Sequence, residues 1–580
     1  MISQTSDKDC MTGYPSIDKP WLKYYPEEAI NEPLPECSIY EYLWENNKEH
    51  LDDIAIIYFK KEITYGKLFD NIDRAASAFS KLGVKKGDIV SFIAITTPEI
   101  IYSFYAINKL GAIANMIDPR MAKSTMIELI HQTNSKLLIT LDIFANDNCL
   151  VLEDCFIKDV VCIRMSNEMS SIYKVLMNLK GKIVIPQNEK IIEWSSLIRI
   201  NTDNIAVDHD CYSSALIEYT GGTTGEPKGV VLSNLNVNSV VEQYKRTGIE
   251  FIRGNVWQCV SAPFIAYVWV ISMHCPLSFG IKCKIVIYDP KTIAENIIND
   301  KFNHVAANPL VWETVMKHPK AQKKDFSHLI VPSTGADYMS PKLELELNNF
   351  LQEHKCKYKI CQGYGMTEVG TAVSVCISNE INRLSSVGIP FVKTVISAFD
   401  IETQQELEYG KTGEICISGP TIMSGYLNNK EETENVLKLH SDGNVGLHLA
   451  DLGHIDSDGF IYIDGRLKRM IIKYNGAKVF PPIIEQILLN QPEIKKCSVV
   501  GIKDKNNSIG MEPIAFIVIN KDCDKQKVKE ELRILCQKEL PDYAQPIDFL
   551  FINEMPFTAI GKVDYRALEK MAEEMENESE

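Results

Sequence analysis

A loop rich in glycine and threonine contains the residue types that point most directly to chemistry. It reads Tyr-Thr-Gly-Gly-Thr-Thr-Gly-Glu-Pro-Lys-Gly over residues 219–229. Closely spaced glycines let the backbone approach an anion and point N–H groups at it. Threonine hydroxyls and a lysine add donors and a positive charge, which is what a triphosphate requires. The candidate ligands, of which Thr223 is also expected to act in catalysis, are Thr220, Gly221, Gly222, Thr223, Thr224, Gly225 and Lys228.

The position of the lysine separates this loop from the Walker A type. Lys228 stands between Pro227 and Gly229, whereas a Walker A lysine stands between a glycine and a serine or threonine. Short apolar runs precede and follow the loop, at residues 215–217 and 230–232. We therefore expect the loop to be a phosphate-binding connection of another kind.

Two further motifs carry charged residues beside glycines. Residues 362–368 read Gln-Gly-Tyr-Gly-Met-Thr-Glu, in which the Glu368 carboxylate suits a hard cation while the glycines leave space for a ligand. Residues 556–564 read Pro-Phe-Thr-Ala-Ile-Gly-Lys-Val-Asp. A lysine near a chain end is normally a solvated surface residue, so a functional role for Lys562 is indicated only by the motifs that precede it.

Taken together and in this order, the motifs resemble those of the adenylate-forming superfamily. This superfamily includes acyl- and aryl-CoA synthetases, luciferases and the adenylation domains of peptide synthetases. The resemblance extends from about Ile39 to Leu568. The family often has serine where this chain has Gly221, a difference that removes a hydroxyl but preserves the backbone cradle.

The resemblance implies a role for each matching residue. Small residues at 333–336 would admit adenine, Asp451 would accept the ribose hydroxyls, and Arg466 would contact ribose or phosphate. Lys468 would be the hinge residue about which the C-terminal domain turns, and Lys562 would bridge the attacking carboxylate and the α-phosphate. In the 362–368 motif, Tyr364 would stack on adenine, Thr367 would contact the α-phosphate and Glu368 would hold Mg²⁺. The nucleotide-site residues beyond the phosphate loop are then Gly335, Ala336, Gln362, Gly363, Tyr364, Gly365, Met366, Thr367, Asp451, Arg466, Lys468, Asn475 and Gly476.

Two departures from the family pattern affect these assignments. The family usually has Thr-Gly before the ribose-binding aspartate, and this chain has Leu449-Ala450, so the local turn geometry is open. The spacing from Arg466 to the next glycine, Gly476, is one residue longer than usual. The roles of Lys473 and Asn475 in the expected thiol channel are therefore weakly defined.

The acyl pocket is expected in the stretch after Pro263. Phe264, Ala266 and Tyr267 are the candidates, with Ala266 at the position where the family often has histidine. No aspartate stands there to bind an amino group, so a free α-amino acid is disfavoured and an apolar acid, fatty or aryl, is favoured. The same stretch, which also contains Trp269, could equally be core packing.

The elements that position these motifs alternate between strand and helix. Helical patterns at Ile39–Asn46, Asp70–Leu82 and Pro98–Leu110 alternate with strand patterns at Ile54–Phe59 and Asp88–Ile95. This alternation predicts βαβ units and parallel sheets. After Gly413 the sequence changes to short strands and turns. We predict an α/β fold with a leader at residues 1–38, a large N-terminal domain at 39–464 that includes a small β-rich subdomain, and a small mobile α+β C-terminal domain at 465–580, with an acidic tail from about 573.

Composition excludes several classes of protein. The net charge of −16 argues against a general nucleic-acid or anionic-membrane surface. The sixteen cysteines include no C-x-x-C pair, so neither a zinc site nor a disulfide framework is expected. Residues 254–281 contain no charged Asp, Glu, Lys or Arg, but polar residues and prolines interrupt them, so we expect buried structure beside a pocket and no transmembrane segment. The reduced thiols and the lack of a signal-peptide pattern predict a cytoplasmic protein.

The sequence therefore predicts an enzyme that uses ATP and Mg²⁺ to convert a small carboxylic acid into an acyl-adenylate and passes the acyl group to a thiol. Coenzyme A is the leading acceptor. The phosphopantetheine of a separate carrier protein is the alternative acceptor. A non-catalytic nucleotide-binding regulatory protein is the alternative of another class.

Overall fold

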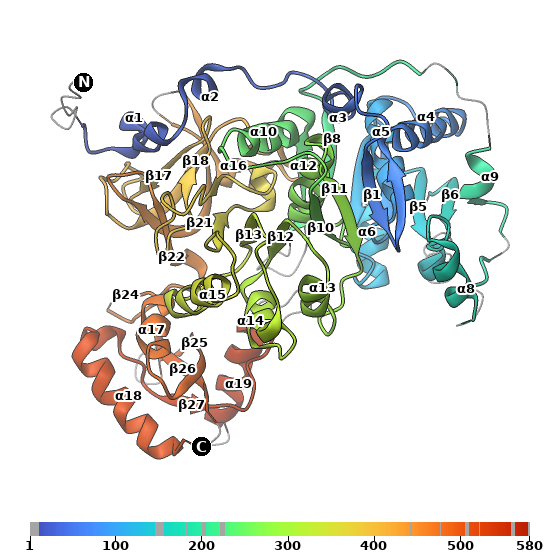
Figure 1. Cartoon of the computed structure of the whole chain (residues 1–580). Helices are drawn as coiled ribbons and strands as arrows, with labels where there is room; N and C mark the ends of the chain where they lie inside the picture. The colour runs from blue at the N-terminus through green and yellow to red at the C-terminus, as the bar shows by residue number, and fades with distance from the viewer. Residues whose placement is uncertain are drawn as a thin grey trace.

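Three large sheets in the N-terminal part and a small C-terminal domain make up the computed structural model (Figure 1). The small domain lies against one end of the large part, beside helix α15 (Pro341–Glu353). The predicted α/β class with a small second domain is confirmed. The structure describes residues 11–145, 156–179, 183–186, 188–199, 203, 205–220, 227–440, 443–475, 477–504, 510–520, 523–557 and 563–577.

The eight-stranded sheet holds the strands on either side of the phosphate loop. Its strands from β8 to β7 are parallel, as the βαβ pattern predicted, whereas β9 and β19 join one edge antiparallel to their neighbours. Helices α4 (Tyr65–Lys81), α5 (Pro98–Lys109), α6 (Lys123–Thr133), α8 (Ser171–Leu179) and α9 (Trp194–Leu197) belong to this part of the chain. The strand order is β19 (Gly425–Tyr426), β9 (Lys228–Ser233), β8 (Ser214–Thr220), β4 (Ile113–Ile117), β3 (Ile89–Ile93), β5 (Leu137–Leu141), β6 (Asp159–Ile163) and β7 (Ile191–Glu193).

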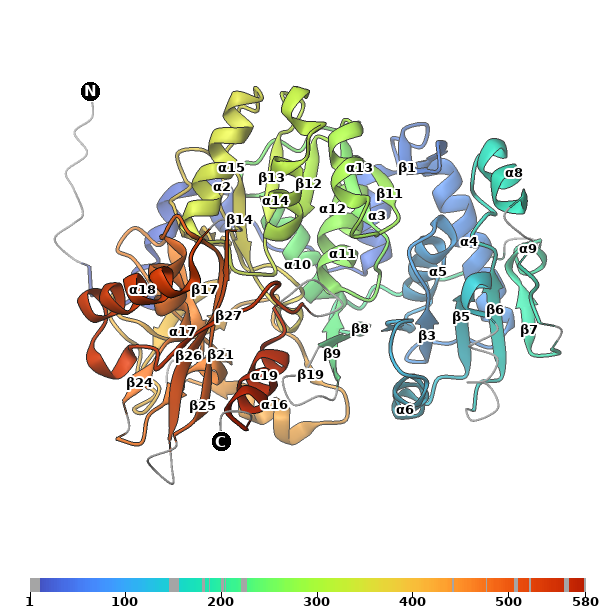
Figure 2. The ribbon, with the colours of Figure 1, turned by 90° about the horizontal axis from the view of Figure 1, so that it is seen from below.

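The nine-stranded sheet is parallel in its centre and antiparallel at both edges. Its order is β16 (Ile389–Pro390), β15 (Ser374–Val375), β14 (Cys361–Tyr364), β13 (Val331–Thr334), β12 (His304–Ala307), β10 (Val256–Val260), β11 (Lys282–Val286), β1 (Ile54–Tyr58) and β2 (Lys61–Thr64). Figure 2 shows α13 (Ile293–Asn299), α14 (Pro309–Lys317) and α15 together along this sheet. The carboxyl ends of β13 and β14 meet at one edge, where ligands of open α/β sheets bind.

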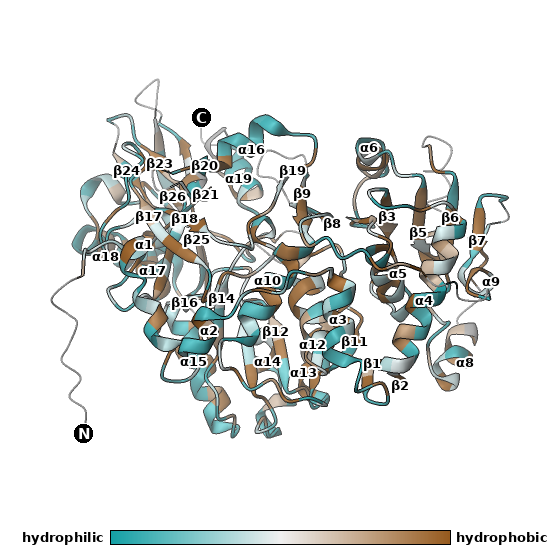
Figure 3. Cartoon of the chain, turned by 90° about the horizontal axis from the view of Figure 1, so that it is seen from above, coloured by the Kyte–Doolittle hydropathy of each residue, from teal (hydrophilic) through white to brown (hydrophobic). Residues whose placement is uncertain are grey.

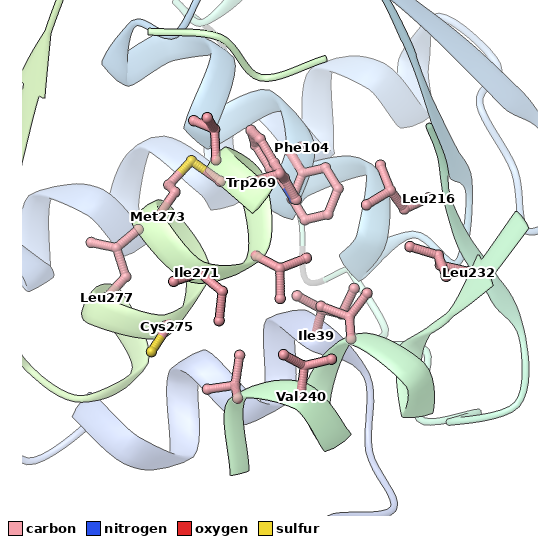
Figure 4. Packing of buried hydrophobic residues seen from close by; sticks show 14 of the residues in the cluster. Ile39, Phe104, Leu216, Leu232, Val240, Trp269, Ile271, Met273, Cys275 and Leu277 are labelled. Atoms are coloured by element: carbon pink, nitrogen blue, oxygen red, sulfur yellow. The ribbon is translucent and has the colours of Figure 1, made fainter. Parts of the chain in front are cut away.

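The charge-free stretch 254–281 forms buried structure, as predicted. It contains β10, α11 (Ala266–Trp269), the π-helix η4 (Val270–His274) and α12 (Cys275–Ser278). The ring centres of Trp269 and of Phe104 on α5 lie 4.2 Å apart in the main core, to which Ile39 of α3 (Ile39–Asn47) and Val240 of α10 (Asn234–Lys245) also belong (Figure 4). His274 contacts Tyr105 and Asn238, and its burial lowers its pKa to about 3, so its ring is neutral. Among the described residues, no helix is long and apolar enough to cross a bilayer.

The third sheet is antiparallel and corresponds to the predicted β-rich subdomain. It is built from β17 (Val395–Phe399), β18 (Gly413–Ser418), β21 (Val445–Ile455), β20 (Leu437–Leu439) and β22 (Ile461–Arg466). The polar leader packs on this sheet through α1 (Pro15–Asp18), η2 (Pro20–Tyr24) and α2 (Glu27–Asn31) (Figure 1). Trp21 is fully buried, and Lys23 pairs with Asp458 at 2.5 Å, so this part of the leader contributes to the core.

The C-terminal domain has its own hydrophobic clusters and its own sheets. The three-stranded sheet of β25 (Ile494–Lys503), β26 (Met511–Ile519) and β27 (Phe549–Phe551) packs with α17 (Pro481–Leu489), α18 (Lys525–Glu539) and α19 (Tyr565–Asn577). A hairpin of β23 (Ile471–Ile472) and β24 (Lys478–Val479) precedes them. In the large part, helix α16 (Lys430–Val436), which buries no residue, is coloured mainly hydrophilic in Figure 3.

Ala450, inside β21, stands where the family usually has glycine, and its backbone is left-handed. Its φ is 62°, a region that costs a residue with a Cβ about 1–2 kcal/mol. The Glu414 carboxylate on the neighbouring strand accepts a hydrogen bond from the Ala450 N–H at 3.0 Å. The turn conformation therefore persists although alanine replaces glycine, and it is held in part by Glu414.

Replacing Ala450 with glycine should raise the free energy of unfolding by up to about 1 kcal/mol, because glycine adopts positive φ without a Cβ penalty. Urea unfolding followed by circular dichroism measures this change. Ala307, a half-buried alanine at the end of β12 outside the positive-φ set, supplies the control. Ala307→Gly should lose about 0.5–1 kcal/mol. Equal losses in the two variants would contradict the strain at Ala450.

Candidate active site

The phosphate loop connects two strands that pair antiparallel. Thr220 at the end of β8 is the register partner of Lys228 at the start of β9, so the two residues stand opposite each other at the base of the loop. The remaining predicted ligands of the loop, Gly221, Gly222, Thr223, Thr224 and Gly225, lie outside the described residues. Their contacts with phosphate stay predictions, whereas the position of the loop between two strands agrees with the expectation.

Tyr426 connects Lys228 to Glu368. The Lys228 Nζ lies 5.2 Å from the centre of the Tyr426 ring and forms an ion pair with Glu432 of α16. The Tyr426 hydroxyl donates a hydrogen bond to Glu368 Oε1 at 2.9 Å. The structure therefore brings the predicted phosphate lysine and the predicted metal-binding carboxylate together, although they are far apart in the sequence.

Glu368 is a carboxylate held in a nearly closed environment. It lies in the short helix η6 (Thr367–Val369) and is 8% exposed. Burial raises its pKa, while the Tyr426 hydroxyl and the charge of Arg466 lower it. The backbone before it is tightly packed, because a Cβ at Gly365 would stand 1.8 Å from the carbonyl oxygen of Thr371. Only glycine fits at that position, which explains one glycine of the motif.

Asp451 joins the nine-stranded sheet to the third sheet. Its Oδ2 accepts a hydrogen bond from the Tyr364 hydroxyl at 2.7 Å, and its Oδ1 lies 2.7 Å from Arg466 Nε. Tyr364 ends β14, whereas Asp451 and Arg466 are register partners on β21 and β22. The Asp451 charge raises the pKa of Arg466 against the opposing effect of burial, so the guanidinium stays charged.

The predicted adenine side lies where β13 and β14 end. Thr334 and Gln362 are parallel register partners, so Gly335 and Gly363 follow at the same edge. A Cβ at Gly335 would stand 3.1 Å from the Gly363 carbonyl oxygen, which requires a small residue between the two strand ends. Ala336 has a positive φ of 68°. This close approach of two backbones beside Tyr364 is compatible with a flat ring.

Other residues of the 362–368 motif have mainly structural contacts. Gln362 is 6% exposed, and its side-chain amide donates a hydrogen bond to Glu344 of α15 at 2.7 Å. Its side chain therefore binds α15 rather than Asp451. Met366 packs against the main hydrophobic core. Thr367 is half-buried at the start of η6. These contacts leave the predicted ligand role of Thr367 untested.

Two arginines flank the predicted hinge residue Lys468, and each pairs with a carboxylate of a different part of the chain. Arg466 pairs with Asp451 in the large part, whereas Arg469 pairs with Glu485 of α17 at 2.5 Å and lies 3.9 Å from the Tyr565 ring. Between them is the short helix η7 (Leu467–Arg469), which contains Lys468. The structure describes the backbone of Lys468 but not its side chain.

The predicted thiol-channel residues and the predicted catalytic lysine belong to the C-terminal part of the chain. Asn475 Oδ1 accepts a hydrogen bond from the Ala477 N–H at 3.0 Å, and Lys473 pairs with Glu512 at 2.5 Å. Gly476 and Lys562 lie outside the described residues. An antiparallel bridge between Phe557 and Val563 closes the segment that contains Lys562.

The acyl-pocket candidates are nearly covered in this structure. Phe264 is 8% exposed and Ala266 is 4% exposed. The Arg120 guanidinium lies 5.0 Å from the Phe264 ring. Tyr267 is half-buried against the main core, and burial raises its pKa. Trp269 of the same stretch is a core residue, whereas a pocket role for Phe264, Ala266 and Tyr267 stays a prediction.

Sequence reasoning missed Tyr426, Glu432 and Glu414. Tyr426 lies on β19, which pairs with β9 through the register Tyr426↔Val230, so strand pairing alone places it beside the phosphate loop. No motif surrounds it in the sequence. Only the pairing of distant strands could have identified it.

Comparison with protein families gives two matches along the chain. Residues 43–427 match the model described as AMP-binding enzyme, and residues 483–562 match the AMP-binding enzyme C-terminal domain. Over 579 residues the chain is 27% identical to a long-chain-fatty-acid–CoA ligase of Bacillus subtilis (strain 168), covering 96% of this chain and 99% of that one. It is 27% identical over 549 residues to a 4-coumarate–CoA ligase of Humulus lupulus, covering 93% and 94%.

Solved structures have the same fold. The ATP-bound MatB of Rhodopseudomonas palustris gives a TM-score of 0.77 at 19% identity, covering 92% of this chain and 98% of that one. An anthranilate CoA ligase in complex with anthranoyl-AMP gives 0.77 at 19% identity, covering 93% and 98%. The resemblance to adenylate-forming enzymes is thus confirmed. Since one family model spans residues 43–427, this chain belongs to the AMP-binding enzyme family.

Proposed function

We propose that this chain is an acyl-CoA synthetase. The substrate carboxylate attacks the α-phosphorus of ATP, pyrophosphate leaves, and the acyl-adenylate then reacts with a thiol to give a thioester and AMP. The observation that carries this proposal is the convergence of Lys228, Glu368, Asp451 and Arg466, from three strands and one short helix, onto one region. The relatives named as long-chain-fatty-acid and 4-coumarate CoA ligases give independent support.

The first step needs no protein nucleophile, because positioning and charge neutralisation suffice for phosphoryl chemistry. Lys228 and the phosphate loop hold the triphosphate, while Asp451 holds the ribose and Tyr364 the adenine. Before any ligand binds, Asp451 is already oriented by Tyr364 and Arg466. Its oxygens therefore need little reorganisation to meet the ribose hydroxyls.

The donor set around Glu368 fits a magnesium ion. Mg²⁺ in nucleotide sites takes one or two carboxylates together with phosphate oxygens, and Glu368 offers a buried carboxylate on the Lys228 side of the site. When bound, the ion would neutralise charge on the phosphates. The Tyr426 hydroxyl fixes one carboxylate oxygen, so the orientation of Glu368 is set in advance.

The second step, thiol attack on the acyl-adenylate, requires another orientation of the C-terminal domain than the first step. Lys562 lies beyond the hinge at Lys468, so one domain orientation brings this lysine to the α-phosphate and another opens the thiol channel. The anchoring of Arg466 to one domain and of Arg469 to the other supports a hinge between them.

The acid is proposed to be apolar, fatty or aryl. Phe264 and Ala266 supply apolar surface, and the two named classes of relatives act on acids of these kinds. Coenzyme A is the proposed acceptor, with a separate carrier protein as the alternative. The alternative of another class is a nucleotide-binding protein without turnover, which the intact set of charged residues disfavours.

The proposal is tested by pyrophosphate release from MgATP across fatty, aryl and amino acids, with and without coenzyme A. Coenzyme A should stimulate release for one class of apolar acid. Slow, stoichiometric release that coenzyme A leaves unchanged would favour a carrier protein as acceptor. Absence of release with every acid would favour the non-catalytic alternative.

Glu368→Gln should lower the rate of adenylate formation by about 100-fold, because it removes the anionic ligand proposed to hold the magnesium ion that neutralises the reacting phosphates. Pyrophosphate release at several magnesium concentrations measures this effect. Glu242→Gln is the matched control, since Glu242 is a half-buried carboxylate of α10 that pairs with Arg246 and accepts from the Tyr42 hydroxyl, outside the charged cluster. An unchanged rate in Glu368→Gln would remove this residue from the site.

Lys562→Ala should lower adenylate formation by about 100-fold or more, because a cation directed at developing charge is worth about 3–4 kcal/mol. Transfer from a supplied acyl-adenylate to the thiol should persist. Lys538→Ala, an exposed lysine of the same domain, serves as the control for both half-reactions. Equal loss of both half-reactions in Lys562→Ala would contradict the use of two domain orientations.

A further inference from the structure

Three metal-ligating side chains meet in the third sheet, outside the proposed nucleotide site. Cys416 lies on β18, His440 lies just after β20, and His448 lies on β21. Their ligand atoms all lie within 4.8 Å of one another. The His440 and His448 Nε2 atoms are 3.0 Å apart, and the Cys416 Sγ is 3.8 Å from His440 Nε2.

These separations are close to those of a tetrahedral metal site. Zinc binds imidazole nitrogen at about 2.0–2.1 Å and thiolate sulfur at about 2.3 Å, so tetrahedral angles put two nitrogens about 3.3 Å apart and nitrogen and sulfur about 3.6 Å apart. Shifts of a few tenths of an ångström would therefore bring both measured pairs to the required distances. Cys416 is 1% exposed and His448 is 4% exposed, whereas His440 is half-buried and leaves one side accessible.

The Glu414 carboxylate orients His448 through the ring nitrogen that faces away from the other two ligands. Glu414 Oε2 lies 3.1 Å from His448 Nδ1, so the ring donates its Nδ1–H to the carboxylate and turns the Nε2 lone pair toward His440 and Cys416. Metal-binding histidines usually donate their other ring N–H to such a partner, which fixes the tautomer. The same Glu414 also accepts from the Ala450 N–H.

The surrounding packing leaves space for the ligand atoms. A Cβ at Gly446 would stand 2.4 Å from His440 Cε1 and 2.6 Å from Cys416 Sγ, so only glycine permits this arrangement. The Phe399 ring lies 4.8 Å from the His440 ring and 5.4 Å from the His448 ring. An aromatic wall and a glycine thus enclose the three ligands on the β-sheet.

We propose that Cys416, His440 and His448 form a binding site for one transition-metal ion of the zinc class, with Glu414 as the residue that positions His448. Thiolate and imidazole ligands together select such ions over magnesium or calcium. Three ligands from the described residues leave one tetrahedral position for water or a further group. The sequence predicts no zinc site, because the three ligands lie on different elements and form no C-x-x-C pair.

The test uses full-length protein stripped of metal by a chelator and then titrated with Zn²⁺ against a chromophoric chelator. Wild type should bind one tight equivalent that Cys416→Ser and His440→Ala both lose. Glu414→Gln should weaken this equivalent by about 10–100-fold. Co²⁺ should give the absorption of tetrahedral cobalt with a thiolate charge-transfer band, and Cys416→Ser should lose that band.

Matched variants separate this site from the chain's many other thiols and imidazoles. Cys376→Ser removes another fully buried cysteine, and His454→Gln removes a histidine of the same strand that contacts Asp464. Both should keep the tight equivalent. Equal zinc stoichiometry in wild type, Cys416→Ser and His440→Ala, each shown by circular dichroism to be folded, would overturn the proposal and leave a hydrogen-bonded histidine pair. The binding readout is independent of enzymatic activity.

Discussion

The carboxylate of Asp451 is the constraint on which the arrangement of the candidate site depends. One of its oxygens meets Tyr364 from the nine-stranded sheet, and the other meets Arg466 at the end of the third sheet. A nearly buried carboxylate is costly unless partners satisfy it. Asp451 is held by the Tyr364 hydrogen bond and by the charge of Arg466, which is close to Oδ1 without a well-aligned hydrogen bond. Pairing Asp451 in this way requires the edge of one sheet and the last strand of another to come together. The proposed nucleotide region lies at that junction.

Local pattern was sufficient to predict most elements of the N-terminal part. The helices α3 and α5 and the strands β1 and β3 fall within about a residue or two of their predicted bounds, since hydrophobic periodicity and Gly or Pro boundaries define them. Helix α4 begins five residues before its predicted start, at Tyr65, because Thr64 caps it by accepting from the Lys67 N–H. The sequence predicts residues 1–38 only as a leader outside the N-terminal domain, whereas Trp21 is fully buried in the core.

Non-local pairing determined what sequence reasoning missed. Tyr426 contacts Glu368 because β19 pairs with β9, and no sequence motif near Tyr426 predicts this contact. The positive φ of Ala450 likewise depends on Glu414 from another strand. By contrast, the 362–368 motif was readable because its glycines are close in sequence, and Gly365 meets a local steric limit set by the Thr371 carbonyl.

The two arginines beside Lys468 define where a domain movement can begin. Rotation before Arg466 would break its contact with Asp451 and leave a buried carboxylate without its cation. Rotation after Arg469 would separate this arginine from Glu485, which is 7% exposed. Only the peptide torsions between the two can change without leaving a buried charge unpaired. If the C-terminal domain turns as proposed, Arg466 is the fixed end of the hinge and Arg469 moves with α17.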